Sequence, residues 1–373
     1  MKLLFLIRSL HAGGMERQFV GLVNEMARRG HETHVAVFYK GGIFEEDLDS
    51  SVCLHGLGKG GRWDLVGFFF RWHCLLRVVR PELVHGYLPT QNILAVLSRL
   101  SVPGIRVVFG VRASFLDFSK YDWLVKLEYC LETKLAKFAH RIIANSESGA
   151  RWLVARGVPA GLVEVIPNGI DVDRYQPDAP GRAAVRAEWG IVASECLVGM
   201  VARLDPIKDH EILLVAVSSL VFRFPAMRLV CVGDGPAKYV SVLSAVADCL
   251  GLSGRLIWAG SRADTAAVFS AFDIAVSCSS SEGFPNTVAE AMACGTPCVV
   301  TDVGDSALIV GDTGVVVHPR DPRALAEAIS TLATESKDDR QVRAIAARKR
   351  ICEFFSNRAL ADRSEALMQS LLA

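Results

Sequence analysis

The feature that most constrains the fold is a repeated alternation of apolar, strand-length runs with helical patterns. In the first half the runs are LLFLI (3–7), HVAVF (34–38), ELVHGY (82–87), RVVFGV (106–111) and RIIANS (141–146). In the second half they are CLVGMVAR (196–203), RLVCVGDG (228–235), RLIWAG (255–260), DIAVSCS (273–279), PCVVTD (297–302) and GVVVHP (314–319). Such runs are typical of parallel sheets that helices cover on both faces. The stretch 166–181 between the two halves is rich in Pro, Asp and Gly and predicts a linker between two α/β domains.

Length and composition agree with two domains and exclude several classes of protein. The chain has 373 residues, of which half are apolar, and a net charge of +1. The first half is net basic and the remainder net acidic, which suggests different partners for each. Ten scattered cysteines show no zinc spacing, and the chain carries neither a signal-peptide pattern nor an apolar run of membrane-spanning length. We therefore expect a reduced cytoplasmic protein without a nucleic-acid partner.

Two loops that follow strands contain residues suited to phosphate. In ARLDPIKDH, Arg203 ends a strand and Lys208 precedes a helix. Two cations on one loop suit a diphosphate. The alternative is a surface pair of Arg203 with Asp205 and a solvated Lys208. In HAGGMER, Gly13 and Gly14 allow close approach to an anion at a helix N-terminus, although the G-x-G-x-x-G fingerprint is absent and a plain turn stays open.

The stretch SEGFPNTVAEAMACG (281–295) precedes and enters a helix of small residues. Thr287 and Glu290 fit a capping box, which would explain Glu290 without a ligand. It does not explain Glu282, which lies in the loop beside Gly283. The helix N-terminus offers amides and a dipole to a second diphosphate contact. His85 and Arg112 lie just past two strands of the first half, where a structural role for His85 stays open beside a role in a cleft.

Taken together, these motifs resemble the group 1, family 4 glycosyltransferases. The resemblance covers nearly the whole chain and is most specific at Glu282-GFPNTVA-Glu290, with support from ARLDPIK, IPNGID and HAGGMER. It implies the GT-B architecture, two Rossmann-like domains with parallel sheets facing a central cleft. The implied domains are 1–168, joined by a C-terminal helix at about 356–373, and 169–355. The first would serve the acceptor and the second the nucleotide sugar.

The resemblance also implies roles for individual residues. Arg203 and Lys208 hold the donor diphosphate, Glu290 binds the ribose, and Glu282 lies beside the donor sugar. The catalytic set is thus Glu282, Arg203 and Lys208. The donor-binding set adds Gly13, Gly14, Gly283, Phe284, Pro285, Asn286, Thr287 and Glu290. Relatives often have a His where this chain has Arg112, which suggests that Arg112 binds donor phosphate or a charged acceptor.

The implied reaction is the retaining transfer of a hexosyl group from a nucleoside diphosphate sugar, with UDP expected and neither metal nor cofactor. The expected acceptor is a saccharide or a lipid-linked molecule of cell-surface polysaccharide or glycolipid assembly. Three alternatives stay open: a soluble acceptor as in sucrose or glycogen synthesis, a sugar-nucleotide epimerase, and a non-catalytic sugar-nucleotide binding protein.

The basic first half also raises the question of a membrane. FFFRWHCLLRVVR (68–80) and FLDFSKYDWLVKLEYCLETKLAKFAHR (115–141) combine aromatic, aliphatic and basic residues. In the second segment Leu124, Leu127, Leu131, Leu135 and Phe138 recur at helical spacing with Lys120, Lys126, Lys134 and Lys137. One interpretation is a core-facing helix with a solvated basic face. The other is peripheral attachment to an anionic membrane at its inner face.

Overall fold

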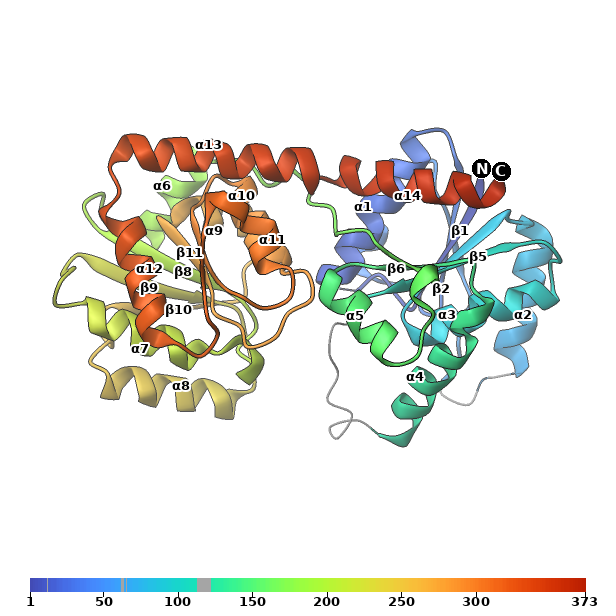
Figure 1. Cartoon of the computed structure of the whole chain (residues 1–373), viewed down its shortest axis with the longest axis horizontal. Coiled ribbons are helices and arrows are strands. Elements are labelled where there is room, and N and C mark those ends of the chain that lie inside the picture. Colours follow the sequence, from blue (N-terminus) through green and yellow to red (C-terminus); the bar gives the residue numbers. More distant parts are fainter. Residues whose placement is uncertain (12, 62–63, 65, 113–121) are drawn as a thin grey trace. The chain divides into compact units, whose positions relative to one another are not determined.

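A computed structural model describes residues 1–11, 13–61, 64, 66–112 and 122–373. The chain divides into two compact units, one of residues Met1–Gly169 with Asn357–Ala373 and one of residues Ile170–Ser356. Each unit contains a parallel sheet with helices on both faces (Figure 1). This confirms the predicted fold class of two Rossmann-like domains with parallel sheets.

The first unit holds a seven-stranded sheet in the order β3-β2-β1-β4-β5-β6-β7. Its strands are β1 (Lys2–Ile7), β2 (Glu32–Val37), β3 (Cys53–Gly56), β4 (Leu83–Tyr87), β5 (Arg106–Val111), β6 (Arg141–Ala144) and β7 (Val163–Val165). Its helices are α1 (Gly14–Arg28), α2 (Val66–Val79), α3 (Pro89–Leu97), α4 (Trp123–Leu135), α5 (Glu147–Ala155) and α14 (Asn357–Leu372). The edge strands β3 and β7 were not predicted, because neither contains a continuous apolar run.

The second unit holds a six-stranded sheet in the order β10-β9-β8-β11-β12-β13. Its strands are β8 (Cys196–Val201), β9 (Met227–Val232), β10 (Leu256–Gly260), β11 (Ile274–Ser277), β12 (Cys298–Thr301) and β13 (Val315–Val317). Its helices are α6 (Ala179–Glu188), α7 (His210–Leu220), α8 (Ala237–Cys249), α9 (Thr265–Ala271), α10 (Asn286–Ala293), α11 (Ser306–Val310), α12 (Pro322–Thr334) and α13 (Lys337–Phe354). All six strands that the sequence predicted here are present.

Local chemistry explains where several helices begin. Asp178 caps α6 by accepting from the Gly181 amide, and Asp321 caps α12 by accepting from two amides. Ser336 caps α13 in the same way. These short polar side chains satisfy amides that have no partner within the helix. The caps fix the first turns of helices that border the cavities discussed below.

The last helix belongs to the first unit although it follows the whole second unit in sequence (Figure 1). The apolar residues Leu360, Leu367 and Met368 of α14 are buried in the same core as β1 and α1. The Arg29 guanidinium on the turn after α1 donates to Glu365 at 2.7 Å and to Asp362 at 2.6 Å. Apolar burial and ion pairs therefore both attach α14 to α1.

Candidate functional site

In the second unit, the candidate site lies where the order of strands reverses direction. From β8 the chain proceeds to β9 and β10 on one side, then returns to place β11 on the other side of β8. Ligands of open α/β sheets bind at such a switch point, outside the carboxyl ends of the strands. The loop after β8 carries Arg203 and Lys208, and the loop after β11 carries Glu282.

Hydrogen bonds to backbone carbonyls join these two loops. The Ser280 amide donates to the Ile207 carbonyl at 2.8 Å, and the Cys278 thiol donates to the Asp209 carbonyl at 3.2 Å. Asp205 accepts from the Ile207 amide and so begins the short 3-10 turn Pro206–Lys208. Lys208 therefore extends from a turn whose position the neighbouring loop fixes.

Lys208 and Glu282 form the central contact of this site. Lys208 Nζ lies 2.5 Å from Glu282 Oε1, and the buried Ser279 hydroxyl donates to the same oxygen at 2.7 Å. The side chains of Lys208 and Glu282 are 22% and 14% exposed, so both charges face little water. The structure thus brings together two of the three residues predicted to be catalytic, although 74 positions separate them.

Arg203 is far more exposed than Lys208. Its side chain is 78% exposed, and its guanidinium lies 3.7 Å from the Asp205 carboxylate. This is the surface pair that the alternative interpretation of the loop expected. The other half of that interpretation, a solvated Lys208, is wrong because Lys208 pairs with Glu282. An exposed guanidinium with one loose contact can turn toward a ligand at little cost.

Helix α10 begins at Asn286, and its start differs from the prediction. Pro285 is the N-cap residue, and no side chain of the described residues caps the helix. The predicted capping box of Thr287 and Glu290 is therefore wrong. Pro285 has no amide hydrogen, so it cannot donate to a phosphate as the other residues of this stretch can. Glu290 is buried one turn into the helix.

Phe284 anchors the turn before α10. The Phe284 side chain is buried, and its ring packs against Phe355 with centroids 5.7 Å apart. Only its backbone is therefore left to face a ligand. The buried ring holds the turn that separates Glu282 from the start of α10.

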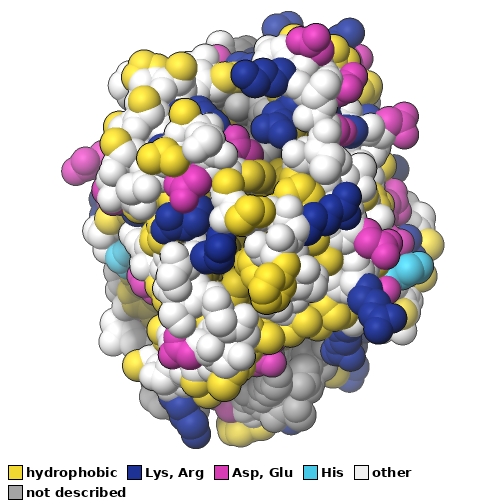
Figure 2. Space-filling model, turned by 90° about the vertical axis from the view of Figure 1, so that its left-hand side faces the viewer, with side chains coloured by type: hydrophobic (Ala, Val, Ile, Leu, Met, Phe, Trp, Pro, Cys, Tyr) yellow, Lys and Arg dark blue, Asp and Glu magenta, His cyan; other side chains and the backbone are white. Residues whose placement is uncertain are grey.

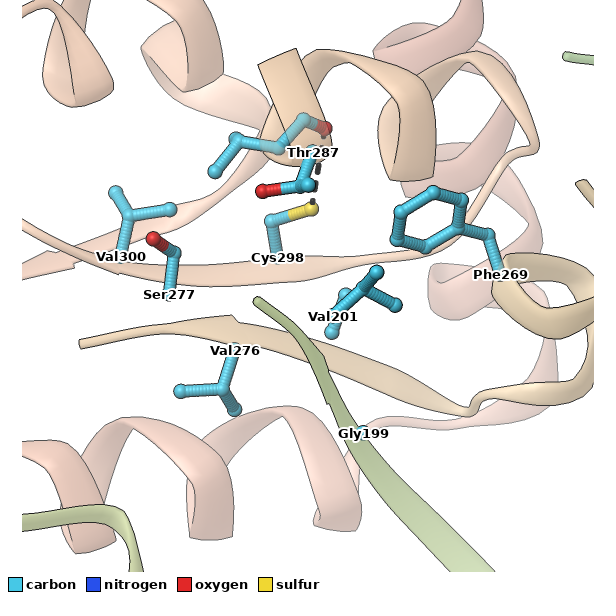
Figure 3. Close-up of a pocket in the computed structure, with 10 residues that line it drawn as sticks. Gly199, Val201, Phe269, Val276, Ser277, Thr287, Cys298 and Val300 are labelled. Carbon is cyan, nitrogen blue, oxygen red and sulfur yellow. Dashed lines mark hydrogen bonds between the residues drawn. The ribbon is translucent and has the colours of Figure 1, made fainter. Parts of the chain in front are cut away.

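Beneath α10, a cavity of about 10 Å³ lies between the helix and the sheet (Figure 3). The side chains of Thr287, Cys298 and Phe269 line it, together with Gly199 and Val201 of β8. This volume is at the lower limit for one water molecule. Thr287 thus points its side chain toward the sheet, which leaves its amide as the group available to a donor.

Several site residues were missed by sequence reasoning. Gly304 has φ +59°, and a Cβ there would lie 2.4 Å from the Gly283 carbonyl oxygen and 2.5 Å from that of Glu282. Gly233 likewise lets the loop after β9 approach the Ala202 carbonyl. Glycines in TDVGD and VGDG, both directly after apolar runs, were the available signal. No sequence signal marked the buried Ser279.

His210 follows Lys208 closely and was also missed. Its ring is fully buried, and neither ring nitrogen has a hydrogen-bond partner among the described residues. Burial first, and the nearby Lys208 charge second, lower the pKa of His210 to about 4. The imidazole is therefore neutral at physiological pH and adds no charge to the site.

In the first unit, Gly13 and Gly14 lie at the start of α1 as predicted from the turn. Gly13 is the N-cap residue, and a Cβ there would lie 2.1 Å from Glu16 Oε2. Burial raises the pKa of Glu16, which its own backbone amide partly offsets. The positive end of α1 already faces a carboxylate, so an anion that binds there must share it with Glu16.

His85 is inside β4, whereas the sequence placed it just past a strand. The ring is fully buried between Phe5 and Tyr87, and neither nitrogen has a partner among the described residues. Burial first, and the Arg112 charge second, hold the pKa of His85 well below its usual range. Arg112 does follow β5: its guanidinium lies 4.9 Å from the Tyr87 ring centroid and donates to Asn168 Oδ1 at 2.5 Å.

Among the described residues, no three His, Cys, Asp or Glu side chains are grouped so that they could hold a metal ion. No described helix is long and apolar enough to cross a membrane. The prediction of a reaction without metal stays a prediction.

Family comparisons place both units in one class of protein. Residues 12–174 match the model described as Glycosyltransferase Family 4, and residues 195–335 match the model described as Glycosyl transferases group 1. The chain belongs to the group 1, family 4 glycosyltransferases.

Curated relatives include a D-inositol 3-phosphate glycosyltransferase of Segniliparus rotundus, which is 30% identical over 306 residues. The alignment covers 79% of this chain and 66% of that protein. An enzyme of the same name from Nocardia farcinica is 34% identical over 212 residues, which cover 54% of this chain and 46% of that protein. The chain thus spans about two thirds of the first relative and about half of the second.

Solved structures of the same architecture superpose along the whole chain. HepE of Anabaena, in complex with UDP and glucose, has a TM-score of 0.82 and 23% identity and covers 99% of this chain and 100% of its own. Sucrose-phosphate synthase of Thermosynechococcus elongatus has a TM-score of 0.83 and 20% identity. The match covers 100% of this chain and 99% of that protein. At this level of identity the likeness establishes the GT-B fold.

Proposed function

We propose that this protein is a retaining hexosyltransferase that moves a sugar from a nucleoside diphosphate sugar to a saccharide or lipid-linked acceptor in cell-surface polysaccharide or glycolipid assembly. The observation that carries the proposal is the Lys208–Glu282 contact at the switch point of the second sheet. Family membership supports the reaction class.

In this proposal Lys208 and Arg203 bind the donor diphosphate and stabilise the charge that develops as it leaves. Lys208, which Glu282 holds in place, does this without reorganising during the reaction, whereas the exposed Arg203 turns toward the donor when it binds. The Lys208 ammonium has three donors, of which Glu282 uses one. Amides of Gly283, Phe284, Asn286 and Thr287 add dipoles at the start of α10. No step requires a metal or a cofactor.

Glu282 lies beside the donor sugar in this proposal, and Glu290 binds the ribose hydroxyls. The Ser279 hydroxyl and the Lys208 ammonium both donate to Glu282 Oε1, which fixes the direction of the carboxylate. Attack by the acceptor on the face that the diphosphate leaves gives retention, with the departing phosphate taking the acceptor proton. Gly13 and Gly14 of the first unit are proposed to contact the same diphosphate.

UDP is the proposed nucleotide. HepE of Anabaena was crystallised with UDP and glucose, and separately with UDP-glucose. The base and the sugar of the donor are the first properties to measure.

A second candidate acceptor is a soluble phosphorylated molecule. Arg112 favours it because its guanidinium follows β5 and is held by Asn168 and the Tyr87 ring. A planar guanidinium suits a phosphate group. The names of the curated relatives, D-inositol 3-phosphate glycosyltransferases, point to the same chemistry. His85 is buried beside this group and is proposed to shape the acceptor side without carrying charge.

Peripheral attachment to the inner face of an anionic membrane is the remaining part of the proposal. The interpretation of a core-facing helix holds only in part: Leu124 and Leu135 are partly buried, whereas Leu127, Leu131 and Phe138 are 42%, 40% and 45% exposed. Trp123 on the same face is 66% exposed, and α4 also carries Lys126 and Lys134. Lys120 and the rest of 113–121 lie outside the described residues. Exposed aromatic and aliphatic side chains beside lysines suit an anionic lipid surface.

Cosedimentation tests the membrane claim. The protein should pellet with phosphatidylglycerol vesicles at low salt and be released by high salt, and substitution of Leu127 and Leu131 by Asp should abolish pelleting. Equal pelleting of this variant and the wild type would contradict attachment through α4, whereas the transferase proposal would be unaffected.

A thermal-shift panel tests the donor claim. A ligand that binds only the native state raises the melting temperature. UDP, GDP, ADP and their glucose derivatives are compared on the wild type and on Lys208→Ala. We expect one nucleotide series to raise the melting temperature of the wild type and to lose most of this effect in the variant. An equal shift in both proteins would contradict the role of Lys208.

A further inference from the structure

A cavity of about 470 Å³ lies in the second unit, remote from the candidate site. It is bordered by the start of α6, by the residues that precede β11 and β12, and by the first turns of α13. It is therefore at the amino ends of these strands, whereas Lys208 and Glu282 are at their carboxyl ends. Its volume falls within the range of small-molecule sites.

The acidic groups of this cavity are already committed to the fold. Asp273 accepts from Arg182 at 2.7 Å, from Arg186 at 3.0 Å and from the Leu197 amide at 2.8 Å. Asp178 caps α6 through the Gly181 amide at 2.8 Å. Asp273 is therefore already paired with two arginines, and Asp178 is held in place by its cap.

Two cations at the cavity have no such partner. Lys337 and Arg340 line it from the first turn of α13, and among the described residues no side-chain hydrogen bond or ion pair is found for either. Arg340 Nε is buried and unpartnered. Arg348, two turns further along, donates instead to the carbonyls of Val172, Tyr175 and Ala293. The side of the cavity formed by Lys337 and Arg340 therefore carries positive charge that no described acidic side chain lining the cavity pairs with.

The remaining wall is apolar. Pro177, Pro297, Ala344 and Ile345 line it. Figure 2 shows the face of the molecule that is on the left in Figure 1, where hydrophobic side chains lie among Lys and Arg side chains. Burial raises the pKa of the Cys294 thiol in this wall to about 12, so the thiol stays protonated. The Cys294 thiol is therefore not a nucleophile, and its wall serves as an apolar contact surface.

We propose that this cavity binds a phosphorylated small molecule. The phosphate contacts Lys337 and Arg340, and the carbon body lies against Pro177, Pro297 and Ile345. A phosphate supplies the acceptors that the unpartnered Arg340 guanidinium lacks, and two adjacent cations suit its double charge. The proposal stands independently of the donor site, because every residue in it belongs to another end of the second unit.

Isothermal titration calorimetry on the full chain tests it with ribose 5-phosphate, inorganic phosphate and unphosphorylated ribose as probes. The wild type is compared with the Lys337→Ala/Arg340→Ala double variant. The matched control is Lys349→Ala, an exposed lysine of α13 outside the cavity. Lys208→Ala separates binding here from binding at the donor site.

We expect ribose 5-phosphate to bind the wild type, Lys349→Ala and Lys208→Ala alike, and to bind the double variant at least about tenfold more weakly, since two charge-assisted contacts are lost. Weaker binding of inorganic phosphate and none of ribose would support a combined phosphate and carbon-body site. Binding that survives in the double variant, binding lost only in Lys208→Ala, or no binding of either phosphate would overturn the proposal. If the double variant does not fold, Ile345→Glu replaces it: Ile345 is 60% exposed, and a carboxylate there should repel the phosphate.

Discussion

The two ends of strand β11 each hold a carboxylate that pairs with cations, and the two pairs differ in how they are held. At the amino end, Asp273 accepts from two arginines and one amide. At the carboxyl end, Glu282 accepts from one lysine and one hydroxyl. Arg186 is buried and also bonds three backbone carbonyls, of Ala271, Val192 and Glu195. Lys208, by contrast, keeps donors for a ligand. The Asp273 cluster therefore stabilises the fold, whereas the Lys208–Glu282 pair can exchange partners with a ligand.

The largest expected effect is on turnover and comes from the carboxyl end. Lys208→Ala should lower the rate of nucleoside diphosphate release by about 10²–10³-fold, the cost of one preorganised charge contact. Steady-state assays with the donor found in the thermal-shift panel measure it, and Lys349→Ala is the control. The melting temperature should change little, because Glu282 keeps its bond to Ser279. Near-normal turnover of Lys208→Ala would contradict a catalytic role of Lys208.

A substitution at the amino end of β11 should instead lower the stability of the protein. Asp273→Asn leaves the buried Arg186 charge without its carboxylate and should lower the free energy of unfolding by about 3 kcal/mol. Urea unfolding measures this cost. Asp264→Asn is the control, since it removes an exposed pair with Arg262 and should cost less than about 1 kcal/mol. Equal costs in the two variants would show that the Asp273 cluster is no more structural than a surface pair.

The close approach of Gly304 to the loop that carries Glu282 gives a third test. Gly304→Ala places a methyl group 2.4 Å from the Gly283 carbonyl oxygen at a residue with φ +59°. The loop that carries Glu282 must then shift, and turnover should fall about tenfold with a stability cost of about 1–3 kcal/mol. Gly254→Ala is the control, because no atom lies within 4 Å of a Cβ there. Unchanged kinetics in Gly304→Ala would mean that this loop tolerates displacement.

The buried Glu132 should give the smallest effect on stability, and one of opposite sign. Glu132 in the first unit accepts from Asn92 at 2.6 Å, and burial raises its pKa to about 7. The folded state then holds a proton that the unfolded state loses above about pH 4.5, so the stability of the wild type should fall between about pH 4.5 and about pH 7. Glu132→Gln removes this dependence and should be more stable than the wild type at about pH 8, by on the order of 2 kcal/mol.

Urea unfolding of wild type and Glu132→Gln at about pH 5 and about pH 8 measures the difference. The two proteins should be nearly equal at the lower pH. Parallel pH profiles would show that Glu132 is ionised in the folded protein.

The sequence predicted the strands well because most strands are buried on both faces and therefore consist of continuous apolar runs. The two missed strands, β3 and β7, are short edge strands with partly exposed residues. His85 was placed past its strand because a polar residue inside a buried strand looks like the end of that strand. The Thr287–Glu290 capping box failed because Pro285 occupies the N-cap position. A local motif cannot show which residue the tertiary fold places there.

The site was predicted in its residue types but not in its contacts. Arg203, Lys208 and Glu282 were recognisable by their positions after strands and by resemblance to the family. Their pairing was not, because it depends on β8 and β11 being neighbours across 74 intervening positions. Ser279 and Gly304 act through contacts with the Glu282 loop, and no local pattern marks such contacts.

The placement of α14 has a consequence for how the protein is made. Residues 357–372 complete the core around β1 and α1, yet a ribosome synthesises them only after the entire second unit. The amino-terminal segment must therefore wait, with part of its apolar surface uncovered, while about half of the chain is translated. During that interval the uncovered apolar surface is open to aggregation, which is the hazard that chaperones counter.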